Sequence, residues 1–172
     1  MQKLFLFILF FPVTATAGAQ VKRIYGYVQD INAGARLDIL HEKESNIEKN
    51  ISFGTKRYFL FTEVKKGSPI SFEQVWIEGG LYTFKSDTIK KIPFVLQSSN
   101  GGEMIFRDTL VKSSTDFIIQ LKDLVKTENT IVPEYLKKTI TENNIVITFK
   151  CKNKLLFIPL QKAVNLSPIF AQ

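Results

Sequence analysis

The segment Ile70–Lys85 most strongly constrains the fold of this chain, because it combines strand-type patterning with a glycine turn. Its sequence, ISFEQVWIEGGLYTFK, is dense in β-branched and aromatic residues, which favour a pleated and half-buried strand. The pair Gly79-Gly80 supplies the positive φ angles that a two-residue hairpin turn requires. We therefore expect a β-hairpin with its turn at Gly79-Gly80, in which Trp76 and Tyr82 lie on opposite sides of the turn and could form a cross-strand aromatic pair.

Strict alternation along the first strand of this hairpin assigns its side chains to two faces. Ile70, Phe72 and Trp76 fall on one face, and Val75 and Ile77 fall on the other. The pattern therefore predicts that Phe72 and Trp76 pack in the same layer.

Three aromatic residues of the hairpin, Trp76, Tyr82 and Phe84, are the candidate ligand-binding residues. One interpretation is an exposed aromatic platform, which would contact sugar rings or a partner chain. The other interpretation is burial in the core and beside the turn. Burial is favoured because aromatic side chains provide the main apolar area that a small β-sandwich can bury.

The same strand pattern recurs over most of the chain, as short alternating runs separated by turn residues. The further predicted strands are Lys22–Asp30, Ala35–His41, Thr55–Val64, Ile92–Gln97, Glu103–Phe106, Ile145–Cys151 and Leu155–Leu160. Because Thr55–Val64 is apolar on both faces, we expect it to be central in a sheet or to lie between two sheets.

Three segments complete the fold prediction. Phe117–Val125 fits both helical spacing and strand alternation, and the surrounding β pattern favours a strand. Pro133–Glu142 predicts a short helix, because proline favours the first turn and an acid follows it. Asn165–Gln172 is predicted to be a tail. The sequence therefore predicts a mainly β, antiparallel, β-sandwich-like single domain over residues 20–172, with one short helix near the C-terminus.

The first 19 residues have the pattern of a cleaved signal peptide. Lys3 provides a short positive region, Leu4–Val13 is an apolar run, and Ala17-Gly18-Ala19 gives a small-x-small cleavage site. The apolar run is short for a membrane span, and no later stretch approaches spanning length. We therefore expect cleavage before Gln20, export to the periplasm or the cell exterior, and no transmembrane segment afterwards.

The chain is basic, but its charges are scattered. The formal net charge is +7, and the predicted mature chain, which lacks Lys3, carries +6. The basic residues occur as separate pairs such as Lys56-Arg57 and Lys90-Lys91, whereas a nucleic-acid groove needs them clustered on one face. We therefore expect no nucleic-acid partner, and attraction to anionic lipids or polysaccharides remains an alternative.

Residues with catalytic or metal-binding chemistry are sparse. His41 is the only histidine and Cys151 the only cysteine, so together they cannot build a typical structural zinc site. Cys151 falls on the apolar side of its strand, which predicts a buried and inert thiol. Acidic residues such as Glu63, Glu73 and Glu78 are scattered, and no pair is identified for glycoside chemistry. The sequence therefore predicts no catalytic residues, no metal ligands and no cofactor.

These observations favour an exported, non-catalytic binding or structural interaction module of the bacterial cell envelope. The alternative is a carbohydrate-binding module that uses exposed aromatics, and a hydrolase acting on an extracellular polymer is less favoured. The expected partner is a glycan or a cell-envelope protein. Two exposed aromatics in one patch would favour the glycan, and a bare apolar edge strand would favour the protein.

Overall fold

The computed structural model describes residues 20–32, 55–99, 105–128 and 130–170 of the chain. The predicted signal segment 1–19 and the predicted strand Ala35–His41 lie outside these residues, as does the start of the predicted strand Glu103–Phe106. Among the described residues, no helix has both the length and the apolar composition needed to cross a membrane.

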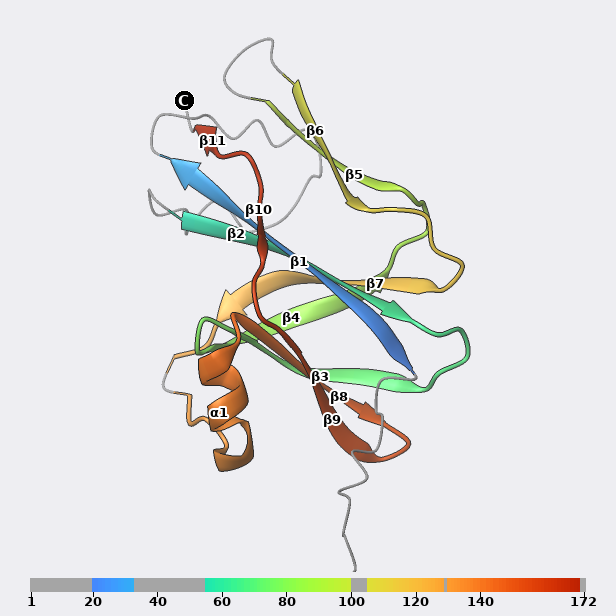
Figure 1. Ribbon diagram of the computed structural model, residues 1–172, viewed down its shortest axis with the longest axis vertical. Helices are drawn as coiled ribbons and strands as arrows, with labels where there is room; N and C mark the ends of the chain where they lie inside the picture. The colour runs from blue at the N-terminus through green and yellow to red at the C-terminus, as the bar shows by residue number, and fades with distance from the viewer. Residues whose placement is uncertain (1–19, 33–54, 100–104, 129, 171–172) are drawn as a thin grey trace, which may run out of the picture.

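The described residues form strands together with one short helix (Figure 1). The elements are β1 (Val21–Asn32), β2 (Thr55–Val64), β3 (Ile70–Ile77), β4 (Gly80–Thr88), β5 (Phe94–Ser99), β6 (Ile105–Val111), β7 (Phe117–Lys126), α1 (Glu134–Glu142), β8 (Ile145–Cys151), β9 (Lys154–Leu160), β10 (Val164–Asn165) and β11 (Ile169–Phe170).

Most strands belong to one curled sheet with the order β10-β1-β2-β7-β4-β3-β8-β9. Strands β5 and β6 form a separate two-stranded ribbon. The curl brings β1 next to β9, and a Cβ atom added to Gly26 would lie only 2.4 Å from Leu160 Cδ2. The fold is therefore mainly β and sandwich-like with one short helix, as predicted.

The inner face of the curled sheet holds the main core. Leu60 of β2, Val75 of β3 and Ile147 of β8 are fully buried in it. Strands β2 and β3 are not neighbours in the sheet, so these side chains meet because the sheet curls around them. Burying each such side chain contributes about 1.5–3 kcal/mol.

Two smaller elements cover the outer face of the sheet. The β5–β6 ribbon covers β2, where Phe61 packs against Phe94 with ring centroids 5.0 Å apart. Helix α1 covers β3 and β8, where Leu136 packs against Trp76. Successive side chains of β2 alternate between the inner core and the ribbon, which confirms that Thr55–Val64 is central and buried on both faces.

The β3–β4 hairpin forms as predicted, but its turn begins one residue earlier than expected. Ile77 and Gly80 are paired, so the two turn residues are Glu78 and Gly79, with φ angles of +48° and +81°. Two positive φ angles match the twist of a tight two-residue hairpin turn. The turn predicted at Gly79-Gly80 is therefore displaced by one residue.

This displacement changes which side chains meet across the hairpin. Trp76 is opposite Leu81, and Tyr82 is opposite Val75. Because side chains alternate with a period of two, a shift of one residue moves a side chain to the other face of the sheet. Trp76 and Tyr82 therefore lie on opposite faces, and the predicted cross-strand pair is wrong.

A β-bulge in β3 causes a second difference from the prediction, in the faces of Phe72 and Trp76. Phe72 is opposite Phe149 of β8, and Gln74 is opposite the adjacent residue of β8, so Glu73 is the extra residue. An extra residue reverses the alternation of the strand. Phe72 faces the inner core and Trp76 faces α1, although the sequence predicted a shared face.

The remaining segments follow the predictions in part. Phe117–Val125 lies within strand β7, and the predicted helix forms as α1 after Pro133. The predicted tail, in contrast, returns to the sheet and pairs in parallel with β1, where Ile169 is opposite Ile31. The sheet is therefore mixed, and its edge beyond β1 is built from the end of the described chain.

Candidate functional site

The predicted ligand-binding residues are divided between two layers of the fold. Trp76 is 1% exposed and lies between β3 and α1, against Leu136 and Ile140, so the burial interpretation is confirmed for this residue. Tyr82 and Phe84 are half-buried on the opposite face, against the inner core. The three side chains do not form one exposed patch, which corrects the interpretation as an aromatic platform.

A cleft lined by both polar and apolar side chains opens at the turn between β3 and β4, and we call it the Glu78 cleft. It consists of two adjoining hollows that are both lined by Glu78 and Asn144. The smaller hollow has a volume of about 270 Å³, and further residues that line it are Asp30, Lys56, Tyr58, Lys162 and Asn165. The larger hollow, of about 680 Å³, runs along α1, and further residues that line it are Val132, Lys137, Ile140, Thr141 and Gln161.

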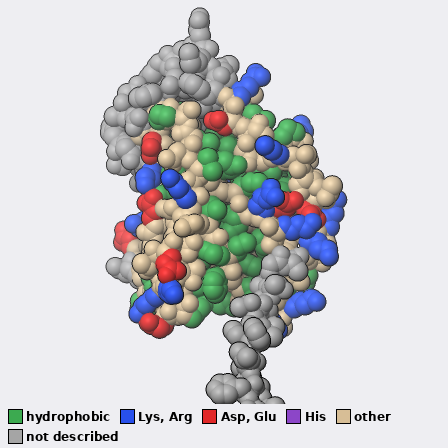
Figure 2. Space-filling model, in the orientation of Figure 1, with side chains coloured by type: hydrophobic (Ala, Val, Ile, Leu, Met, Phe, Trp, Pro, Cys, Tyr) green, Lys and Arg blue, Asp and Glu red, His purple; other side chains and the backbone are tan. Residues whose placement is uncertain are grey.

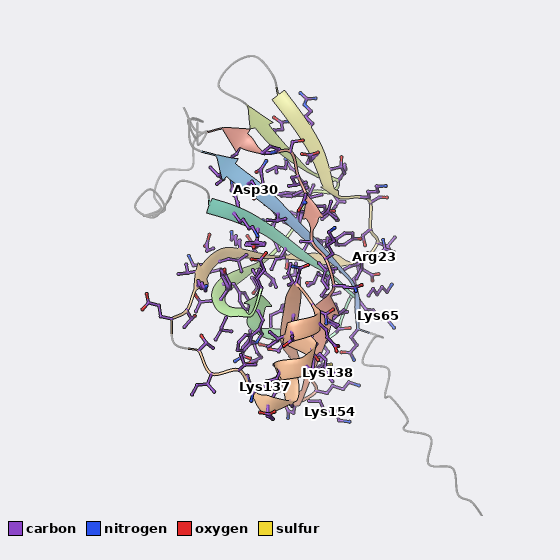
Figure 3. All side chains as sticks on the ribbon, turned by 60° about the vertical axis from the view of Figure 1, so that its left-hand side comes forward. Arg23, Asp30, Lys65, Lys137, Lys138 and Lys154 are labelled. Carbon is purple, nitrogen blue, oxygen red and sulfur yellow. The ribbon has the colours of Figure 1, made fainter. Side chains whose placement is uncertain are left out.

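The cleft extends from the end of β1 to the side of α1. Figure 3 shows Asp30 near the end of β1 and Lys137 on α1 below it, and each of these residues lines one of the two hollows. Figure 2 shows acidic and basic side chains interspersed along this side of the molecule. The cleft therefore has a mixed charge and an elongated outline.

Glu78 is the centre of the hydrogen bonds in the cleft. Its backbone N–H donates to the Asn144 carbonyl oxygen at 2.8 Å, which ties the turn to the start of β8. Lys56 Nζ of β2 donates to Glu78 Oε1 at 2.8 Å. The Tyr58 hydroxyl, two residues further along β2, interacts electrostatically with the same carboxylate.

This network fixes the protonation states in the cleft. The Lys56 hydrogen bond lowers the pKa of Glu78 below its ordinary value, and the carboxylate in turn raises the pKa of Lys56. Burial raises the pKa of Tyr58 strongly, and the Glu78 charge raises it further. At neutral pH the cleft therefore presents a carboxylate, an ammonium group and a protonated hydroxyl side by side.

The network contributes little to stability. The side chains of Lys56 and Glu78 are 47% and 48% exposed, and an exposed ion pair is worth only about 0–1 kcal/mol. Against this, the left-handed φ angle of Glu78 costs about 1–2 kcal/mol for a residue with a Cβ atom. This angle is the one that a tight two-residue hairpin turn requires, and Lys152 has the same φ angle in the turn between β8 and β9.

Most residues of the cleft were not identified from the sequence. Lys56 and Tyr58 of β2 are far in the chain from Asn144, and only the curl of the sheet brings them together. Glu78 was recognised only as one of several scattered acids. Its position directly before two glycines was the one local signal, because a charged residue in a tight turn is well placed to contact a ligand.

A second surface is the outward side of strand β9. Within the described ranges β9 pairs only with β8, and it exposes Leu155 (48%) and Phe157 (42%) together with Pro159. Lys152 and Lys154 are exposed at its N-terminal end.

The other chemically reactive groups do not extend either surface. Cys151 is a buried free thiol, as predicted, and its Sγ contacts Gln20 Oε1. In the part of the chain that the structure describes, no group of three His, Cys, Asp or Glu side chains could hold a metal ion. Comparison with protein-family models, with curated protein sequences and with solved structures found no match for this chain.

Proposed function

We propose that this protein is an exported, non-catalytic binding module of the bacterial cell envelope, and that it holds its ligand in the Glu78 cleft. The observation that carries the proposal is the placement of Glu78 at the boundary of two hollows. There its carboxylate accepts a hydrogen bond from Lys56 and interacts with Tyr58, from a turn residue with a φ angle of +48°.

The energetics of this placement support recognition as its role. A half-exposed ion pair gives little stability, and the left-handed turn residue opposes it. Asparagine or glycine would form the same turn with less strain. Lys152 has the same φ angle in a turn that does not border the cleft, so the support for recognition comes from what the Glu78 carboxylate contacts and not from the strain of the turn.

The N-terminal sequence supports the location. The apolar run Leu4–Val13 and the small residues Ala17-Gly18-Ala19 have the composition and spacing of an export signal. An exported module would encounter its ligand in the periplasm or outside the cell.

The proposal is tested by mapping ligand binding onto the backbone. Amide spectra of the ¹⁵N-labelled chain from Gln20 would be recorded with neutral saccharides, amino acids, dipeptides and inorganic phosphate in turn. We expect one class to give saturable shifts at the amides of Glu78, Asn144 and Asn165, while those of Lys152 and Asn153 stay unchanged. Shifts confined to other regions, or none with any class, would refute the proposal.

A second candidate function is docking of a protein partner on β9. Leu155 and Phe157 are exposed on β9, which in the described part of the chain has a hydrogen-bonded neighbour on one side only. Lys152 and Lys154 precede them in the chain. The complementary partner is an extended segment with alternating apolar and acidic residues, which would add a strand to the sheet.

This second function is tested with a synthetic peptide of alternating valine and glutamate and with its scrambled form. We expect only the alternating peptide to bind, and Phe157→Glu to abolish binding. Val125→Glu is the matched control, because Val125 is also exposed but lies on β7, away from β9. Equal binding of both peptides, or of both variants, would exclude strand addition at β9.

A further inference from the structure

We infer that the ligand of the Glu78 cleft is an uncharged oligosaccharide that lies across both hollows. This inference rests on the proposed binding function and specifies its ligand. Four features of the cleft lead to it: the balance of charge, the mixture of hydrogen-bond donors and acceptors, the apolar patches, and the continuity of the two hollows.

The charges that line the cleft cancel. The smaller hollow has two acidic residues, Asp30 and Glu78, and two basic ones, Lys56 and Lys162. In the larger hollow, Lys137 and Glu142 are each paired along the helix, with Glu134 and Lys138 respectively. A site with balanced charges gives no net attraction to an ion, although the protein as a whole is basic.

The polar side chains offer both donors and acceptors. Asn144 and Asn165 each present an amide that donates and accepts, and the Tyr58 hydroxyl does both as well. Glu78 accepts and Lys56 donates. Sugar hydroxyl groups also donate and accept, so adjacent hydroxyls on one ring can bond a carboxylate and an ammonium group at the same time.

Apolar groups lie among these polar ones. Val28 and Ala163 line the smaller hollow, and Val132 and Ile140 line the larger. A saccharide ring has C–H faces between its hydroxyls, and burying these against small apolar side chains adds to affinity. Inorganic ions and small polyanions have no such faces, so the apolar patches favour a sugar over them.

The two hollows form one path. They share Glu78 and Asn144, and the larger hollow continues along α1 as far as Lys137 and Thr141. A single sugar ring occupies one hollow, whereas a chain of rings reaches both. Glu78 then lies beside the linkage between neighbouring rings, where its carboxylate can accept hydrogen bonds from both.

The test is calorimetric titration of the chain from Gln20 with neutral cello-, malto-, xylo- and manno-oligosaccharides of one to six units. We expect one series to bind with an affinity that rises about tenfold or more between one and three units, a gain of about 1.4 kcal/mol. The affinity should not depend on salt, because no net charge is neutralised.

Two variants test whether the oligosaccharide extends into the larger hollow. Thr141→Trp fills the hollow beside α1, so it should remove the gain with chain length while leaving the single sugar bound. Tyr135→Trp is the matched control, because Tyr135 is exposed on the same helix and does not line the hollow. Equal affinity for one and three units, or an unchanged chain-length gain in Thr141→Trp, would overturn the spanning arrangement.

The same titrations separate this inference from the proposed function. Amino acids and dipeptides also carry no net charge, and they are titrated in parallel. If only these shift the amides of Glu78 and Asn144, the saccharide assignment fails and the binding cleft stands. If no ligand of any class binds there, both the saccharide assignment and the proposed function fail.

Discussion

Glu78 and Lys152 occupy the same position in two separate hairpin turns, and both have a φ angle of +48°. Glu78 begins the turn between β3 and β4, and Lys152 begins the turn between β8 and β9. Only the first of these turns borders the cleft. Substitutions at both positions change the same strained turn conformation, but only the substitution of Glu78 also changes a side chain at the cleft. Comparing the two positions therefore distinguishes the effect of turn strain from the effect of the side chain.

The first prediction compares asparagine at these two positions, because asparagine adopts left-handed φ angles readily. Lys152→Asn should raise the free energy of unfolding by about 0.5–1 kcal/mol. Glu78→Asn should gain less, because it also loses the bond to Lys56. Urea unfolding curves of the two variants measure this difference, and a larger gain for Glu78→Asn would contradict the account of the network.

The second prediction concerns acid. The bond from Lys56 lowers the pKa of Glu78 from its ordinary 4.5, so the ionised carboxylate stabilises the fold above pH 4.5. This contribution is lost as the pH falls through the lowered pKa. Wild type and Glu78→Gln should therefore differ in Tm at pH 6 and converge as the pH falls below this lowered pKa. A difference that grows on acidification would reverse the sign of the linkage.

The third prediction concerns alkali. Burial is the main cause of the raised pKa values of Tyr25, Tyr27, Tyr58 and Tyr82. Groups with raised pKa values stabilise the fold fully below their ordinary value of 10.0, and this stability is lost as the pH rises above it. Absorbance at 295 nm should therefore show these tyrosines ionising above pH 10 and together with unfolding. Complete ionisation near pH 10 in the folded protein would be the contrary result.

The fourth prediction tests how closely the curled sheet closes. A Cβ atom at position 26 would lie 2.4 Å from Leu160 Cδ2 and 3.1 Å from Ile145 Cδ1. Gly26→Ala should therefore destabilise the fold by about 1–3 kcal/mol through overpacking. In a Leu160→Ala background the cost should fall, which gives a coupling energy of about 1 kcal/mol in a double-mutant cycle. Additive effects would show that β1 and β9 do not meet at this point.

The fifth prediction uses the only tryptophan. Trp76 lies under Leu136 of α1, so its fluorescence should be blue-shifted and insensitive to iodide. Leu136→Ala should shift the emission to the red and destabilise the fold by about 2–5 kcal/mol. Tyr135→Ala, at an exposed position of the same helix, is the control and should change neither. A red, readily quenched emission in the wild type would contradict the helix–sheet packing.

The parts of the fold that depend on local sequence pattern could be predicted from the sequence. The central strand Thr55–Val64 and the strand Ile145–Cys151 have the predicted bounds, because alternation and turn residues determine them. The bulge at Glu73 and the one-residue shift of the β3–β4 turn were missed. Each depends on how β3 pairs with its neighbours, and a local pattern does not contain that information.

The cleft was harder to predict from the sequence than the fold. Its residues come from β1, β2, the β3–β4 turn, helix α1 and the segments after α1 and β9. They meet because the sheet curls and because the segment after β9 returns to β1. Neither feature can be read from the spacing of Lys56, Glu78 and Asn144 along the chain.

The most direct test of the account is the ligand affinity of Glu78→Asn beside that of Lys152→Asn, measured with the ligand that shifts the cleft amides. Both variants carry the same new side chain at the same turn position, so they differ only in whether the turn borders the cleft. The account predicts that Glu78→Asn loses affinity by about tenfold or more, the loss expected for a hydrogen bond to a charged group, while Lys152→Asn binds as the wild type does. Equal binding by both variants would contradict the assignment of the Glu78 cleft as the binding site.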